Sequence, residues 1–64
     1  MCLLKVYLEG GTEKKRIAED VALIIQEGEV FKLLGLDLKS GDVLEKVEVS
    51  LVDTLNSIVV FKSK

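Results

Sequence analysis

The only cysteine of the chain, Cys2, stands directly after the initiator methionine. Its thiolate and its own backbone nitrogen can hold one metal ion together in a five-membered chelate ring. If Met1 is removed, Cys2 offers a free amine beside the thiol. If Met1 is retained, its amine, the Cys2 amide and the Cys2 thiolate can act together as a tridentate ligand. Nitrogen and sulfur donors in a planar arrangement suit nickel(II) or copper(II), whereas zinc prefers tetrahedral sites.

A single chain cannot supply four ligands from this motif without help. Two chains related by a twofold axis can, because each gives one sulfur and one nitrogen. Taken alone, Cys2 is also typical of a small apolar residue at the end of a core strand, and that alternative stays open.

Other residue types that support catalysis are missing from the chain or unpaired. There is no histidine, so no Ser-His or Cys-His pair can activate a nucleophile. Carboxylate pairs such as Glu19-Asp20 are typical of solvated turns, and the glycines lack the spacing of a phosphate-binding loop. The sequence therefore predicts a protein that is not an enzyme.

The charge of the chain argues against a nucleic-acid surface. The net charge is −2 and the isoelectric point is about 5.0. The basic run Lys14, Lys15 and Arg16 is flanked by Glu13 and Glu19, which is typical of a solvated turn of mixed charge. Because no overall basic face is expected, nucleic-acid binding is disfavoured.

The size of the chain calls for a partner or a metal. Its 64 residues make one domain, residues 1–64, with a marginal core. One cysteine excludes an intrachain disulfide, and 48% of the residues are hydrophobic. An apolar surplus in so small a domain predicts an exposed patch that serves as a subunit interface. The longest fully apolar run is Val21 to Ile25, far short of the roughly 20 residues of a membrane span, and no signal peptide is recognisable, so a cytoplasmic location is expected.

Most of the chain predicts short strands joined by tight turns. Residues 2–9 alternate between two faces, residues 26–36 are typical of a hairpin with its turn at Glu27-Gly28, residues 43–53 alternate again, and 58–62 form a last strand. Since unpaired sheet edges aggregate, a partly closed barrel is the favoured arrangement. Some apolar residues point outward and need a second chain to cover them: Leu3, Tyr7 and Ile24.

The segment 12–26 is ambiguous. Its apolar residues fit helical spacing with Thr12 as a cap, and the pattern alone slightly favours a helix. The alternation of Val21, Leu23 and Ile25 favours a strand instead.

Four stretches of the chain together resemble the CooT-type proteins, which are small nickel-binding proteins also classed as predicted RNA-binding proteins. They are "MCLLKVYLE", "EDVALIIQEGEVFKL", "DLKSGD" and "VSLVDTLNSIVVF". The resemblance runs over about residues 1 to 62. It implies a small all-β barrel, strands rather than a helix over 17–26, a homodimer, and nickel held by Cys2. The best-known members look like chaperones that supply nickel to carbon monoxide dehydrogenase.

With this resemblance, we expect an all-β fold: a small, five-stranded, partly closed antiparallel barrel of the SH3 or Sm type, in a homodimer. The strands are expected near residues 2–9, 15–26, 29–36, 43–52 and 57–62. The expected core is Leu4, Val6, Leu8, Val21, Leu23, Ile25, Phe31, Leu33, Val47, Val49, Leu51 and Val60.

The expected function is nickel binding by a homodimer that acts as a nickel carrier. Nickel(II) is held by the Cys2 thiolate and backbone nitrogen, with the amine of Met1 where that residue is retained. The dimer interface is expected at Leu3 and Tyr7. The alternatives are a small RNA-binding barrel and an interaction module in which the cysteine has no role.

Overall fold

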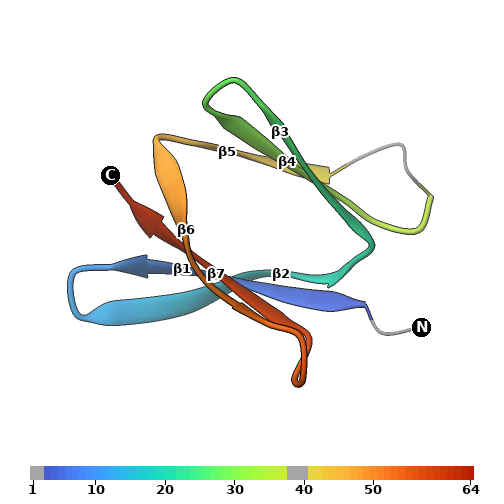
Figure 1. Ribbon diagram of the computed structural model, residues 1–64, viewed down its shortest axis with the longest axis horizontal. Helices are drawn as coiled ribbons and strands as arrows, with labels where there is room; N and C mark the ends of the chain where they lie inside the picture. The colour runs from blue at the N-terminus through green and yellow to red at the C-terminus, as the bar shows by residue number, and fades with distance from the viewer. Residues whose placement is uncertain (1–2, 38–40) are drawn as a thin grey trace.

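The computed structural model describes residues 3–37 and 41–64, and this part of the chain consists of strands and connecting turns without a helix. Seven strands form two sheets (Figure 1). They are β1 (Leu4–Gly10), β2 (Glu13–Val21), β3 (Leu23–Glu27), β4 (Val30–Leu34), β5 (Gly41–Glu45), β6 (Val47–Asp53) and β7 (Ile58–Ser63). The all-β fold is therefore confirmed, and the helix that the pattern of residues 12–26 slightly favoured is wrong.

The four-stranded sheet has the order β2-β1-β7-β6, and the three-stranded sheet has the order β3-β4-β5. All neighbouring strands are antiparallel except β1 and β7, which are parallel. The expectation of an antiparallel arrangement throughout is therefore wrong at the centre of the larger sheet. The first and last strands of the chain meet there, and no hairpin forces their direction.

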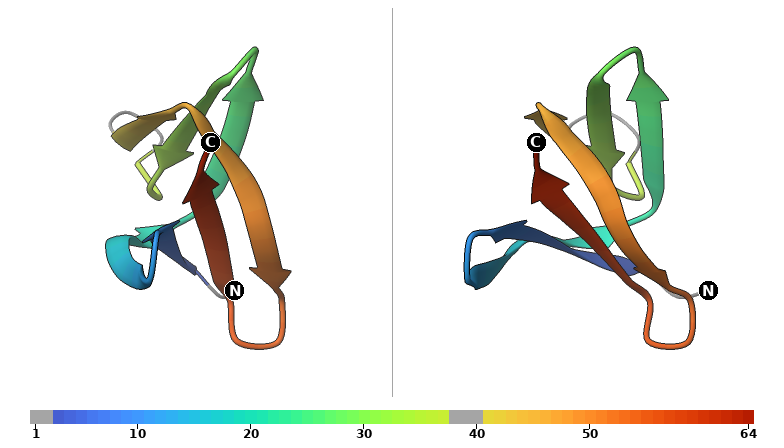
Figure 2. Two further views of the ribbon diagram at one scale, coloured as in Figure 1. Left: turned by 90° about the vertical axis from the view of Figure 1, so that its left-hand side faces the viewer. Right: turned by 60° about the vertical axis from the view of Figure 1, so that its left-hand side comes forward.

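Two of the five expected strands are each divided at a corner between the sheets. The expected strand 15–26 is divided at Ala22, between β2 and β3, and the expected strand 43–52 is divided at Lys46, between β5 and β6 (Figures 1 and 2). The backbone bends because Asp20 and Lys46 adopt left-handed φ angles of 57° and 58°.

Backbone hydrogen bonds support both corners. The amide of Ala22 donates to the carbonyl of Leu34 at 2.8 Å, and the amide of Lys64 donates to the carbonyl of Lys46 at 3.0 Å. Strand pairing does not join the two sheets anywhere in the described residues, so this part of the chain forms two sheets rather than a closed barrel.

One core lies between the sheets. The buried apolar residues are Val6, Val21, Phe31, Leu33, Val47, Val59, Val60 and Phe61, and all of them except Val60 form one cluster. The rings of Phe31, from the smaller sheet, and Phe61, from the larger sheet, have centroids 4.9 Å apart at an interplanar angle of 59°. Leu4 and Leu8 are partly buried against this core, as expected.

Four residues of the expected core are exposed instead: Leu23, Ile25, Val49 and Leu51, at 43%, 38%, 47% and 49%. At the Ala22 corner the alternation changes phase, so Ile24 packs against the core although it was expected to point outward. A register shift between Val49 and Leu51 changes again which face of the sheet the alternating side chains of β6 point to.

Candidate functional site

The expected metal ligands, Cys2 and Met1, lie outside the described residues. The first residue that the structure describes is Leu3, which is bonded directly to Cys2 and is half-buried. The surroundings of Leu3 are therefore the part of the candidate site that can be examined.

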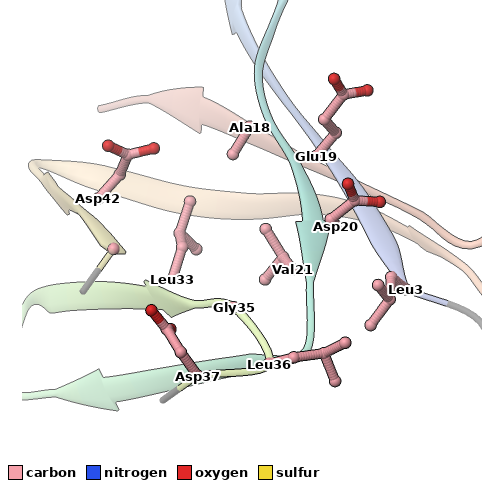
Figure 3. A pocket seen from close by; sticks show the side chains of 11 residues that line it. Leu3, Ala18, Glu19, Asp20, Val21, Leu33, Gly35, Leu36, Asp37 and Asp42 are labelled. Atoms are coloured by element: carbon pink, nitrogen blue, oxygen red, sulfur yellow. The ribbon is translucent and has the colours of Figure 1, made fainter. Parts of the chain in front are cut away.

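Leu3 lines an open depression of about 530 Å³ at the corner where β2 turns toward β3 (Figure 3). Its floor includes the buried side chains of Val21 and Leu33. Four acidic residues are among those that line the depression: Glu19, Asp20, Asp37 and Asp42. Among the described residues that line the depression there is no lysine or arginine. We call it the acidic depression.

The carboxylates of the acidic depression are spread around its rim. Figure 3 shows Glu19 and Asp20 of β2 on one side and Asp37 and Asp42 on the other. Glu19 also lies 3.8 Å from the guanidinium of Arg16, with both side chains more than half exposed. Within residues 3–37 and 41–64 there is no group of three or more His, Cys, Asp or Glu side chains close enough to hold a metal ion. The depression can attract cations by its charge, but its described residues do not form a ligand set.

The two residues expected at the dimer interface line different hollows. Tyr7 is half-buried, like Leu3, but it lies on the outer face of the four-stranded sheet. There it lines a hollow of about 380 Å³ with Leu51, Ile58 and Val60. Neither hollow contains both Leu3 and Tyr7.

The contribution of β6 and β7 to this outer face was not predicted from the sequence. The signal was available in the last strand, because "IVVF" is apolar without alternation, which is typical of a strand with both faces covered. Val59 and Phe61 belong to the core cluster, whereas Val60 is only 3% exposed although it points to the opposite face.

A hydrogen-bonded turn fixes the end of β6 beside this hollow. The carboxylate of Asp53 accepts hydrogen bonds from the side-chain amide of Asn56 at 2.9 Å, the backbone amide of Asn56 at 3.0 Å and that of Leu55 at 3.1 Å. These bonds, the side-chain amide of Asn56 first, lower the pKa of the exposed Asp53 carboxyl. The turn is closed by Ser57, whose φ is 58°.

The described part of the chain contains no helix with the length and apolar character that a membrane-spanning helix requires. No protein-family model matches the chain, and no curated protein matches it either. The similarity to CooT-type proteins therefore rests on the four stretches of sequence quoted above.

Proposed function

We propose that this protein is a nickel-binding homodimer in which Cys2 of each chain supplies its thiolate and its backbone nitrogen to one nickel(II) ion. The observation that carries this proposal is the position of Leu3. The residue bonded to Cys2 lines a depression whose described lining includes four acidic residues. Such a surface concentrates divalent cations close to the chain start.

The chemistry of the donors selects among those cations. Thiolate and amine or amide nitrogen favour nickel(II) over manganese(II) and iron(II), which follows the general order of affinities. Carboxylates alone would favour harder cations such as magnesium or calcium. The acidic depression therefore supplies attraction, and Cys2 supplies a preference for nickel(II) or copper(II) over the harder cations. The choice of nickel between these two comes from the sequence resemblance.

Two features of the fold support the finer architecture that we propose, a partly closed barrel. The chain continues from β2 into β3 and from β5 into β6, so two bent strands belong to both sheets. Together with β1, β4 and β7 these make five strands around one core, in the manner of a small barrel whose corners are made by bends.

A nickel site that opens at the chain start suits a protein that carries the metal rather than one that uses it in catalysis. We propose that it acts in the cytoplasm and delivers nickel to a metalloenzyme, and carbon monoxide dehydrogenase is the client that the sequence resemblance suggests. Release is favoured by acid, because a proton and the metal compete for the thiolate.

The test is a nickel titration of the chain and of Cys2→Ser, followed by the thiolate-to-nickel charge-transfer absorbance. The chain should bind one nickel per two copies and release protons, with tighter binding as the pH rises. Cys2→Ser should bind more than about 100-fold more weakly, because changes to groups behind the ligands already cost roughly 10–100-fold. Its circular dichroism should be unchanged.

Two further variants separate the attraction of nickel by the acidic depression from its ligation at the chain start. Asp42→Asn, which removes one charge from the acidic depression, should keep the charge-transfer band and weaken nickel binding by a few fold, more so at low salt. A residue added before Met1 should weaken binding strongly if the terminal amine is a ligand. Equal nickel affinity for the chain and Cys2→Ser would overturn the proposal.

A further inference from the structure

A row of alternating charges crosses the outer face of the four-stranded sheet. Glu9 of β1 is paired in register with Lys14 of β2 on one side and with Lys62 of β7 on the other. Lys62 is in turn paired with Glu48 of β6, and their charged groups lie 3.9 Å apart. From β2 to β6 the charges therefore run positive, negative, positive, negative. We call these four residues the charged row.

An apolar row lies beside the charged row on the same face. Tyr7 is paired in register with Val60, and Val60 with Leu51. These three residues line the hollow of about 380 Å³, together with Lys14 at its β2 side. Leu51 remains 49% exposed at the β6 edge. The apolar surface that this face offers comes from Tyr7, which is half-buried, and from Leu51, and charged side chains lie beside it, a combination that is common in interfaces.

We propose that two copies of the chain pair through this outer face, around a twofold axis that runs parallel to β1 and β7 and passes between them. The inference rests on the homodimer of the proposed function and names the surface that forms it. Such an axis reverses the strand order, so β2 of one copy faces β6 of the other and β1 faces β7. Lys14 then meets Glu48 of the second copy. Glu9 likewise meets Lys62, so every member of the charged row faces an opposite charge.

The exposed surface area of the chain is compatible with a second copy as the partner. The chain exposes 4611 Å², about 500 Å² more than the roughly 4,100 Å² expected of a folded monomer of 7.1 kDa. An interface in which each copy buries about 500 Å² reaches about 1,000 Å², the lower limit for a specific complex. The same axis places the two Leu3 residues at one end of the dimer, because it keeps the direction of β1. The chain starts that carry Cys2 therefore begin on the same side.

The outer face of the three-stranded sheet is the competing surface, and it exposes Leu23, Ile25 and Val43. Its central strand carries Lys32 between Ile25 and Val43. A twofold axis along that strand would place Lys32 against Lys32 of the second copy. This face is therefore not complementary to itself.

The first test inverts the charged row with Glu9→Lys, Lys14→Glu, Glu48→Lys and Lys62→Glu in one chain. All pairs within the sheet keep opposite charges, and the inverted chain also remains complementary to itself. Native mass spectrometry of each chain alone should show dimers. An equimolar mixture, after exchange, should contain far less than the half share of mixed dimers that random pairing gives. Random mixing would overturn the proposed surface while leaving the homodimer intact.

The second test uses two exposed leucines on the outer faces of different sheets, Leu51→Lys and Leu23→Lys, with 49% and 43% exposure in the native chain. Arg16 of β2 is paired in register with Tyr7, so Leu51→Lys puts a charge into the apolar row opposite Arg16 of the second copy. Its dimer dissociation constant, measured by sedimentation without metal, should rise by at least about tenfold. Leu23→Lys should change it by less than about threefold. The reverse order would overturn the proposal, as would a native chain that is monomeric at micromolar concentration with and without nickel. Nickel titration of Leu51→Lys shows separately whether Cys2 binds the metal.

Discussion

The contact between Phe31 and Phe61 is expected to hold the two sheets together, and Phe61→Leu tests this. Phe61 is fully buried on β7, and its ring is 4.9 Å from that of Phe31 on β4. An aromatic pair contributes about 0.5–1.5 kcal/mol beyond the area it buries. The smaller leucine also leaves a void of about one methyl group or more, which costs about 1 kcal/mol. The expected loss is therefore about 2 kcal/mol of the free energy of unfolding.

This loss is large for a chain of 64 residues. At roughly 0.05–0.15 kcal/mol per residue, its total free energy of unfolding is only about 3–10 kcal/mol. Urea unfolding followed by far-ultraviolet circular dichroism should show the midpoint falling by about 1–2 M, given a slope of about 1–2 kcal/mol/M. Protein concentration must be held constant, because dimerisation stabilises the folded chain.

Two further variants make the measurement decisive. Leu55→Ala, at a side chain that is 91% exposed, should change the free energy by less than about 0.5 kcal/mol. A double-mutant cycle with Phe31→Leu should give a coupling energy of about 0.5–1.5 kcal/mol between the rings. Strictly additive losses would refute the reasoning, because the sheets would then be held by burial alone.

Substitutions at three other positions test particular backbone and side-chain features. Gly41→Ala should destabilise the fold by about 3 kcal/mol in thermal melts, because a Cβ at this position would overlap with the backbone carbonyl of Leu33. Lys46→Gly should raise the melting temperature slightly and Lys46→Val should lower it, since only glycine adopts a φ of 58° without strain. Hydrogen bonds from Asn56 lower the pKa of Asp53, so the stability they give is full above the ordinary carboxyl pKa and is lost as the pH falls through the lowered one. Asp53→Asn should remove this pH dependence, and a carboxyl NMR titration should place the native midpoint below the ordinary range.

The sequence predicts the strand content well because alternation with a period of two is a local property. The expected strands near 2–9 and 57–62 correspond to β1 and β7. The hairpin is confirmed as well, although its turn is Gly28-Glu29, one residue later than expected, because Glu27 still pairs with Val30. Gly28 has a φ of 62° in this turn. These features depend only on neighbouring residues and on glycine in a turn.

The corners could not be predicted because they carry no local signal. Neither Ala22 nor Lys46 is a glycine or proline, and a lysine with positive φ is uncommon. Each corner changes which residues face the core, and the assignment of Leu23 and Ile25 to the core fails for this reason. Alternation identifies two faces, but only the tertiary structure decides which of them is buried.

The candidate site divides in the same way. The donor chemistry of Cys2 is a property of one residue and can be proposed from the sequence, and it stays a prediction because Cys2 lies outside the described residues. The acidic depression and the charged row each combine strands that are distant in sequence, through the corner at Ala22 and the parallel pairing of β1 with β7. Tyr7 was expected at an interface, and its neighbours Leu51 and Val60 become visible only once that pairing is known.

The proposed metal site and the proposed pairing surface would both shift the equilibrium between monomer and dimer. A nickel ion whose ligands come from two chains binds the dimer and not the monomer. At a free nickel concentration about 100 times its dissociation constant, it stabilises the dimer by about 2.7 kcal/mol, which is about 100-fold in the dimer dissociation constant. Linkage is reciprocal, so the chain must bind nickel more tightly the larger the share of it that is paired. An interface of about 1,000 Å² is at the lower limit for specific association, so the metal can still shift its equilibrium. A carrier needs this property, because weakening the contact between two chains would then also weaken the hold on the metal, and a client that displaces one chain would receive the ion.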